Sequence, residues 1–182
     1  MQGWKKGFTI VELIIVIVVI ALLALIVLVS YNRMRNISHD TTVMADLRNL
    51  SGRLKLFESD NNTAPVVADL VALKWTANRN AYNTNGTTVT RNIVYCYSLP
   101  TLSDNRYWVV VALSKSGKIF YTTQSEEPKE YTKAIKPTFD DAETTCATLT
   151  SQVTGQTYER VYHGWYASDT TTGPWRTWTQ QQ

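Results

Sequence analysis

The feature that most constrains this chain is an apolar run from Leu13 to Val29, in which no side chain is polar. Ile10 and Val11 extend the run towards the N-terminus, so that Glu12 is the single polar residue between Ile10 and Val29. About 20 helical residues cover the roughly 30 Å hydrocarbon core of a bilayer, so the segment predicts a membrane-spanning helix. A carboxylate inside such a helix costs about 2.5 to 3.5 kcal/mol or more, and Glu12 is therefore a candidate functional residue.

The residues before this run form a recognisable motif. Lys5-Lys6-Gly7-Phe8-Thr9 leads directly into Ile10-Val11-Glu12. A short basic leader, a glycine, a phenylalanine, a threonine, two apolar residues and a glutamate resemble the cleavage motif of type IV prepilins and pseudopilins. The resemblance implies that a membrane aspartic peptidase, the prepilin peptidase, hydrolyses the Gly7–Phe8 bond and methylates the new amine of Phe8.

The same resemblance gives Glu12 a role. In the family, this glutamate meets the terminal amine of a neighbouring subunit, and both charges are neutralised in the apolar filament core. A separation of four residues also predicts that Glu12 lies on the helix face of its own Phe8. A carboxylate in the first turn is favoured by the helix dipole as well.

Two simpler interpretations of the N-terminus are a signal peptide and a plain membrane anchor. The apolar core of a signal peptide has about 7 to 15 residues and ends at a small-residue cleavage site. Here the run is longer, and Ala21 and Ala24 lie inside it. A plain anchor gives Glu12 no role, so the prepilin interpretation accounts for more of the segment.

Net charge favours no particular partner. The 182 residues carry a formal charge of +3, and cleavage after Gly7 removes Lys5 and Lys6 and leaves +1. Basic residues flank the span on both sides, with Arg33 and Arg35 after it, so they do not set its orientation. The resemblance implies that the leader is cytoplasmic and that the C-terminal domain lies outside the cytoplasm.

Beyond the span, apolar residues recur at intervals of three, four or seven and predict that the helix continues as an amphipathic segment. This stripe consists of Ile37, Met44, Leu47, Leu50, Leu54 and Phe57. We therefore expect one helix of roughly 50 residues. The expected parts are a leader at 1–7, a transmembrane segment at 8–30, an amphipathic segment at 31–58 and a globular head at 59–182.

The head has signals of both strands and helices. A short helix from Pro65 to Trp75 and a surface loop from Asn78 to Asn92 are expected first. Residue types then predict strands at 92–98, 107–113, 118–122 and 158–166, a connection at 126–137 and a helix at 140–153. The segment Ser114-Lys115-Ser116-Gly117 predicts a hairpin between the second and third strands, and the continuous apolar run of the second strand predicts burial on both faces. The predicted fold class is α+β, a long N-terminal helix packed on an antiparallel sheet, which is also the fold that the resemblance implies.

Cys96 falls on a predicted strand and Cys146 on the inward face of a predicted helix. An even, small number of cysteines suits a disulfide in an exported domain, and this one would add about 4 kcal/mol by constraining the unfolded chain. The alternative is two buried free thiols. A zinc site is not indicated, because His39 and His163 are far apart in the sequence and there is no Cys-x-x-Cys motif.

The C-terminal region combines aromatic and cationic residues that are candidates for ligand binding. They are Arg160, Trp165, Tyr166, Trp175, Arg176 and Trp178. Aromatic side chains beside cations stack on the bases of single-stranded nucleic acid or on sugars, and filaments of the resembling family can bind DNA. The alternative is that these residues close a core or pack between subunits.

Neither a metal site nor an active site is expected. Asp140, Asp141 and Glu143 are candidates for calcium binding, but three acids at a helix start are better explained as caps. The sequence has no nucleophile elbow, phosphate-binding loop or dinucleotide fingerprint, so we expect neither an enzyme nor a cofactor.

The prediction is a structural subunit of a type IV pilus-like extracellular filament, stored in the membrane before assembly. The resemblance implies four partners: the prepilin peptidase, sibling subunits, an inner-membrane platform and an assembly ATPase. The alternatives are a pseudopilin of a type II secretion or DNA-uptake system and a minor pilin that binds DNA or surfaces through its C-terminal aromatic residues.

Overall fold

The structure, a computed structural model, describes residues 7–70, 72–82, 90–97, 107–139, 142–153 and 162–167. The chain forms two compact units, Met1–Ile37 and Ser38–Gln182. We call them the N-terminal unit and the C-terminal unit.

The first helix, α1, runs from Ile10 to Asn61 and confirms the prediction of one long helix. It contributes to both units. In the C-terminal unit its buried face includes Leu47, Leu50 and Leu54, as the stripe predicted. Ile37 is 54% exposed and was wrongly placed in the stripe, because burial starts only in the C-terminal unit, with Val43 as its first fully buried apolar residue.

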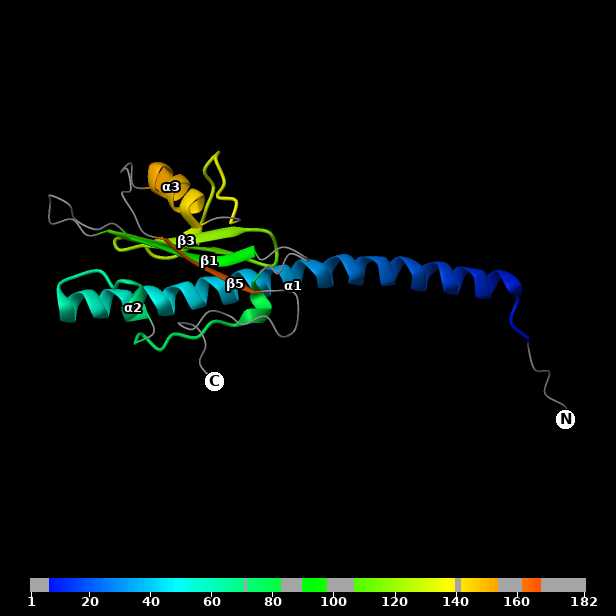
Figure 1. Cartoon of the computed structure of the whole chain (residues 1–182). Coiled ribbons are helices and arrows are strands. Elements are labelled where there is room, and N and C mark those ends of the chain that lie inside the picture. The colour runs from blue at the N-terminus through cyan, green and yellow to red at the C-terminus, as the bar shows by residue number, and fades with distance from the viewer. Residues whose placement is uncertain are drawn as a thin grey trace. The chain divides into compact units, whose positions relative to one another are not determined.

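A five-stranded antiparallel sheet forms the centre of the C-terminal unit (Figure 1). The strands are β1 (Thr90–Tyr97), β2 (Trp108–Leu113), β3 (Ile119–Thr123), β4 (Lys129–Glu130) and β5 (Tyr162–Ala167). Their order across the sheet is β4-β3-β2-β1-β5. The four predicted strands are confirmed where the structure describes them, and residues 98 and 158–161 lie outside the described residues. β4 was predicted to be part of a connection, because two residues paired with β3 carry no strand pattern of their own.

The β2–β3 hairpin follows the predicted turn. The Ser114 N–H donates to the Lys118 carbonyl at 2.8 Å, and the Gly117 N–H donates to the Ser114 carbonyl at 2.9 Å. Gly117 has a φ of 88°, a left-handed conformation that glycine adopts without steric cost. This glycine therefore fixes the register of the hairpin, in which Leu113 faces Ile119.

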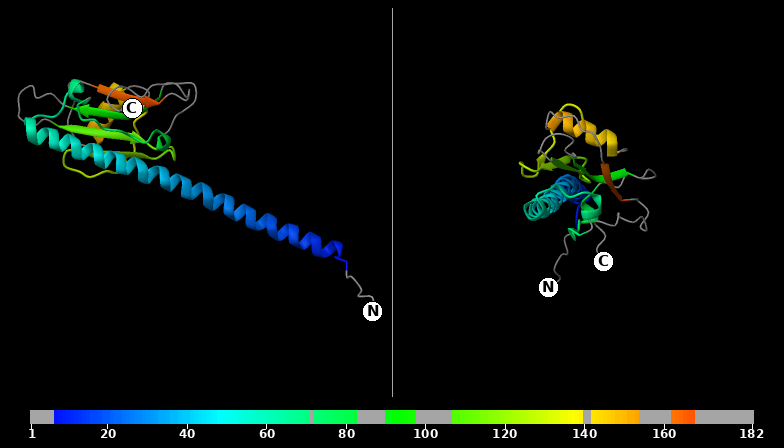
Figure 2. Two further views of the ribbon diagram at one scale, coloured as in Figure 1. Left: turned by 90° about the horizontal axis from the view of Figure 1, so that it is seen from below. Right: turned by 60° about the vertical axis from the view of Figure 1, so that its left-hand side comes forward.

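Helices cover both faces of the sheet, α1 on one and α3 (Ala142–Val153) on the other (Figure 2). Side chains alternate between the two faces along each strand. On β2, Val110 and Ala112 join the cluster that includes the buried face of α1. Val109 and Val111 join a second cluster with Leu149 of α3. The continuous apolar run of β2 is explained by burial on both faces, as predicted.

The segment after α1 differs from its prediction. The helix expected from Pro65 to Trp75 is only α2 (Val67–Leu70), and Lys74, with a φ of 48°, has a left-handed backbone that cannot continue it. The indole of Trp75 is fully buried and donates its N–H to the Asp46 carbonyl at 3.2 Å.

The predicted surface loop at Asn78–Asn92 is also wrong in its first part. A short 3-10 helix, η1 (Arg79–Ala81), leads to Tyr82, which is fully buried and donates its hydroxyl hydrogen to Asp46 Oδ2 at 2.9 Å. The Asn78 N–H donates to the same oxygen at 2.9 Å. Residues 75–82 are therefore held to α1 by Asp46, a residue that the sequence analysis did not single out.

Candidate processing and assembly site

The predicted cleavage site lies just before the first turn of α1. Gly7 and Phe8 precede the helix, which begins at Ile10, and the Thr9 carbonyl accepts the first helical hydrogen bond, from the Leu13 N–H at 3.3 Å. Phe8 is 87% exposed, and a Cβ added at Gly7 would meet no atom within 4 Å. In this structure the Gly7–Phe8 bond is therefore sterically open, which is what an enclosing peptidase site requires.

Glu12 and Thr9 together cap the start of the helix. The Thr9 N–H donates to Glu12 Oε2 at 2.8 Å, and the Thr9 hydroxyl donates to the same oxygen at 2.7 Å. In return the Glu12 N–H donates to Thr9 Oγ1 at 3.3 Å. This reciprocal pattern is a capping box, in which two backbone N–H groups without helical partners are satisfied by side chains.

The capping box corrects one expectation about Glu12. Because the helix begins at Ile10, Phe8 does not share a helical face with Glu12, and the carboxylate bonds instead to the residue three positions before it. Sequence reasoning missed Thr9 as the partner, although threonine followed three residues later by glutamate is the sequence signal of a capping box.

The apolar side chains of the first half of α1 are exposed throughout. Among Ile10 to Val29, the large apolar residues have exposed fractions from 48% at Val19 to 80% at Ile10. Among the described residues, α1 is the one helix that is long enough and apolar enough to cross a membrane, judged by length and composition. No described residue of the N-terminal unit covers this apolar surface.

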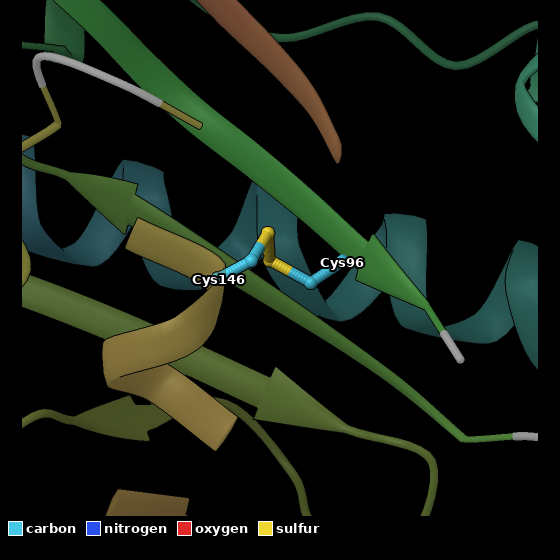
Figure 3. Close-up of a disulfide and its surroundings, with 2 residues drawn as sticks. All are labelled: Cys96 and Cys146. Carbon is cyan, nitrogen blue, oxygen red and sulfur yellow. A yellow bond between two sulfur atoms is a disulfide. The ribbon is translucent and has the colours of Figure 1, made fainter. Parts of the chain in front are cut away.

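The two cysteines form a disulfide between strand β1 and helix α3 (Figure 3). The Cα atoms of Cys96 and Cys146 are 5.6 Å apart, within the usual range for such a bond. Both residues are buried in the cluster between the sheet and α3, together with Leu149 and Val94. The bond therefore fixes α3 to the sheet face that lies opposite α1.

The predicted C-terminal ligand site is described only in part. Trp165 and Tyr166 belong to β5, where their Cα partners on β1 are Ile93 and Arg91. The remaining candidates lie outside the described residues: Arg160, Trp175, Arg176 and Trp178. Ligand binding by this set stays a prediction.

The calcium prediction is likewise only partly described. Asp140 and Asp141 lie outside the described residues, and Glu143 is an exposed residue in the first turn of α3. Within the described part of the chain, no group of three His, Cys, Asp or Glu side chains is arranged to hold a metal ion.

Comparison with known proteins identifies the N-terminal segment. The prokaryotic N-terminal methylation motif, which is the type IV pilin and pseudopilin signature, matches residues 5–28. The match includes Gly7, Phe8, Thr9 and Glu12. No curated protein and no solved structure matches the chain.

Proposed function

We propose that this chain, which carries the type IV pilin and pseudopilin signature at residues 5–28, is the structural subunit of an extracellular pilus-like filament. The observation that carries the proposal is a helix whose apolar surface is exposed and whose start combines Gly7, Phe8 and Glu12. The fold is the α+β arrangement expected of a pilin, with a long helix on an antiparallel sheet.

Processing would begin at the exposed Gly7–Phe8 bond. Hydrolysis by a prepilin peptidase adds one water, leaves the carboxylate on Gly7 and frees the amine of Phe8. The same enzyme then transfers a methyl group from a sulfonium methyl donor to the neutral amine, which gives the methylated ammonium of Phe8 and leaves the donor as a thioether. The leader takes Lys5 and Lys6 with it. The product keeps the spanning part of α1 in the bilayer, with the C-terminal unit outside the cytoplasm.

Assembly would then bury the apolar surface of α1 and give the carboxylate of Glu12 a partner of opposite charge. Burying one large aliphatic side chain contributes about 1.5 to 3 kcal/mol in water, and within the lipid the close packing of helices is the main gain. Glu12 is held by Thr9 in the single chain. In the filament its carboxylate would pair with the Phe8 ammonium of a neighbouring subunit, where the low dielectric strengthens the attraction.

Two substitutions separate charge pairing from helix capping. Glu12→Gln removes the charge but keeps an acceptor oxygen for Thr9, and Thr9→Val removes the hydroxyl of the capping box and leaves the charge. Glu127→Gln, which makes the same chemical change at an exposed residue of the C-terminal unit, is the matched control.

The experiment is electron microscopy of sheared filaments together with immunoblots of the cleaved subunit in a host that supplies the assembly machinery. We expect Glu12→Gln to be cleaved but to form no filaments, and Thr9→Val and the control to form them. Normal filament amounts in the Glu12→Gln strain would refute charge pairing as the basis of assembly. Short assemblies confined to the cell envelope would instead support a secretion or DNA-uptake pseudopilin.

A further inference from the structure

A polar cavity of about 630 Å³ lies in the C-terminal unit, where α1 ends. It is separate from the N-terminal site and from the disulfide. Its lining residues are Lys55, Glu58, Ser59, Asn62, Thr63, Ala64 and Gln124. A volume of this size is typical of cavities that hold small ligands.

Hydrogen bonds fix both walls of the cavity. On one side α1 stops at Asn62, whose backbone is left-handed with a φ of 51° and whose N–H donates to the Glu58 carbonyl at 2.8 Å. On the other side, Gln124 lies in a turn closed by the Glu126 N–H, which donates to Thr123 Oγ1 at 2.9 Å. The cavity is therefore formed by the fold itself, without a ligand.

Glu58 is the most constrained polar group of the cavity. Burial raises the pKa of its carboxyl group, while the Trp108 indole N–H, the Lys55 ammonium and the Gln124 amide act against this rise. The Trp108 side chain is fully buried, and its Nε1 makes no hydrogen bond of normal geometry within the described residues. The indole N–H therefore acts on Glu58 from outside normal hydrogen-bond geometry.

The charges of the cavity favour neither anions nor cations. Lys55 and Glu58 cancel each other, so that an anion such as phosphate is repelled by the carboxylate and a metal cation by the ammonium. Glu127 also reaches Lys55, at 3.4 Å, and so weakens its attraction for an anion.

The lining is also unsuited to an apolar ligand. Six of its seven residues are polar, Ala64 being the exception. Carboxylate, amide and hydroxyl groups together provide both donors and acceptors. A neutral molecule with several hydroxyl groups satisfies both kinds of group at once.

We propose that this cavity binds a sugar unit of a neutral polysaccharide, with Glu58 and Gln124 as its main hydrogen-bonding residues. Glu58 accepts from sugar hydroxyls, and the amide of Gln124 both donates and accepts. Ser59 and Asn62 complete the contacts from the end of α1. The inference does not depend on filament assembly, since all of these residues belong to one C-terminal unit.

The test uses the full chain in phospholipid nanodiscs, so that no sugar-based detergent competes. The probes are neutral oligosaccharides built from glucose, galactose or N-acetylglucosamine, with inorganic phosphate and calcium chloride as the charged comparisons. Binding is followed by the indole N–H resonance of Trp108 in nitrogen–proton NMR spectra, which is assigned with Trp108→Phe. We expect a saturable shift with at least one neutral oligosaccharide and none with phosphate or calcium.

Substitutions place the binding in the cavity. Glu58→Gln and Gln124→Ala are expected to weaken binding by about tenfold or more, the effect of losing a good hydrogen bond. Glu130→Gln removes the same kind of charge at a residue that pairs with Lys118 and does not line the cavity, and it is expected to leave binding unchanged. Gln124 is exposed, so its substitution remains informative if Glu58→Gln impairs folding.

The absence of a saturable shift with every neutral oligosaccharide would overturn the proposal. So would stronger binding of phosphate or calcium, or an equal loss of binding in the Glu130→Gln control.

Discussion

The two halves of α1 use the same residue types for different purposes. Leu22, in the N-terminal unit, is 56% exposed, whereas Leu50, in the C-terminal unit, is fully buried. The second half packs on a sheet that the chain itself supplies. The first half has no such partner among the described residues, so its apolar surface requires lipid or another subunit.

The acidic residues of the two halves differ in the same way. Asp40 accepts from the Ser114 hydroxyl at 2.6 Å, and Asp46 accepts from Asn78 and Tyr82 at 2.9 Å, so both hold distant segments of the C-terminal unit to α1. Among the residues that the structure describes, Glu12 bonds only to Thr9, three positions before it. The comparison indicates that acids in the second half stabilise the fold, whereas Glu12 can change partners without disturbing it.

The largest effect on the C-terminal unit is expected from removing the disulfide. Replacing both Cys96 and Cys146 by alanine should lower the free energy of unfolding by about 4 kcal/mol, since the bond closes a long loop. The sequence separation of the two cysteines is 50 residues. Near-ultraviolet circular dichroism during thermal unfolding measures the loss, and an unchanged midpoint would show that α3 is held by packing alone.

A matched pair of leucine substitutions tests the comparison directly. Leu50→Ala should destabilise the C-terminal unit by about 3 kcal/mol, because it leaves a cavity between α1 and the sheet. Leu22→Ala should leave that stability unchanged, because Leu22 belongs to neither buried cluster of the described residues. Thermal unfolding in micelles measures both, and equal losses would contradict the division into two units.

A smaller effect is expected at Asp46. Asp46→Ala removes the acceptor of two hydrogen bonds and should cost about 1.5 to 3 kcal/mol. Asp46→Asn, which keeps one acceptor oxygen, should cost less. An alanine variant as stable as the wild type would show that segment 75–82 does not depend on this residue.

The same residue predicts a dependence on pH. Burial raises the pKa of Asp46 above 3.8, although hydrogen bonds from Asn78 and Tyr82 oppose this. The folded chain therefore holds this proton more tightly than the unfolded chain, and stability should rise as the pH falls through the raised pKa. The free energy of unfolding of the wild type should increase relative to that of Asp46→Asn on acidification from about pH 7 to about pH 4. A difference between the two free energies that does not change with pH would exclude this linkage.

The smallest effect is expected from the surface ion pairs of α1. A carboxylate oxygen of Glu127 lies 3.7 Å from Arg48 Nε and another lies 3.4 Å from Lys55 Nζ. The side chain of Glu127 is 68% exposed, that of Arg48 62% and that of Lys55 38%. Exposed pairs contribute about 0 to 1 kcal/mol, so Glu127→Gln should shift the unfolding midpoint only slightly, and less at high salt. A shift as large as that of Leu50→Ala would contradict this ranking.

Sequence patterns predicted the parts of the fold that depend on local periodicity. The helical stripe through Leu47, Leu50 and Leu54 and the hairpin around Gly117 were both found in the structure. The patterns could not locate where burial begins on α1, because that depends on how far the sheet extends along the helix. Ile37 was therefore assigned wrongly, and Val43 was missed.

The remaining differences have tertiary causes. β4 exists only through its pairing with β3, and Tyr82 packs in the apolar core with its hydroxyl satisfied by Asp46. At the processing site, by contrast, the motif itself identified Gly7, Phe8 and Glu12 as candidates. It did not reveal the capping role of Thr9, which depends on where the helix begins.

The central claim is that the exposed apolar half of α1 belongs to a processed subunit that begins at Phe8. Mass spectrometry of the N-terminal peptide, purified from the native host, tests this most directly. We expect a mature chain that starts with N-methylated Phe8 and lacks residues 1–7. An intact start at Met1, or a cut near Ala24, would contradict the account.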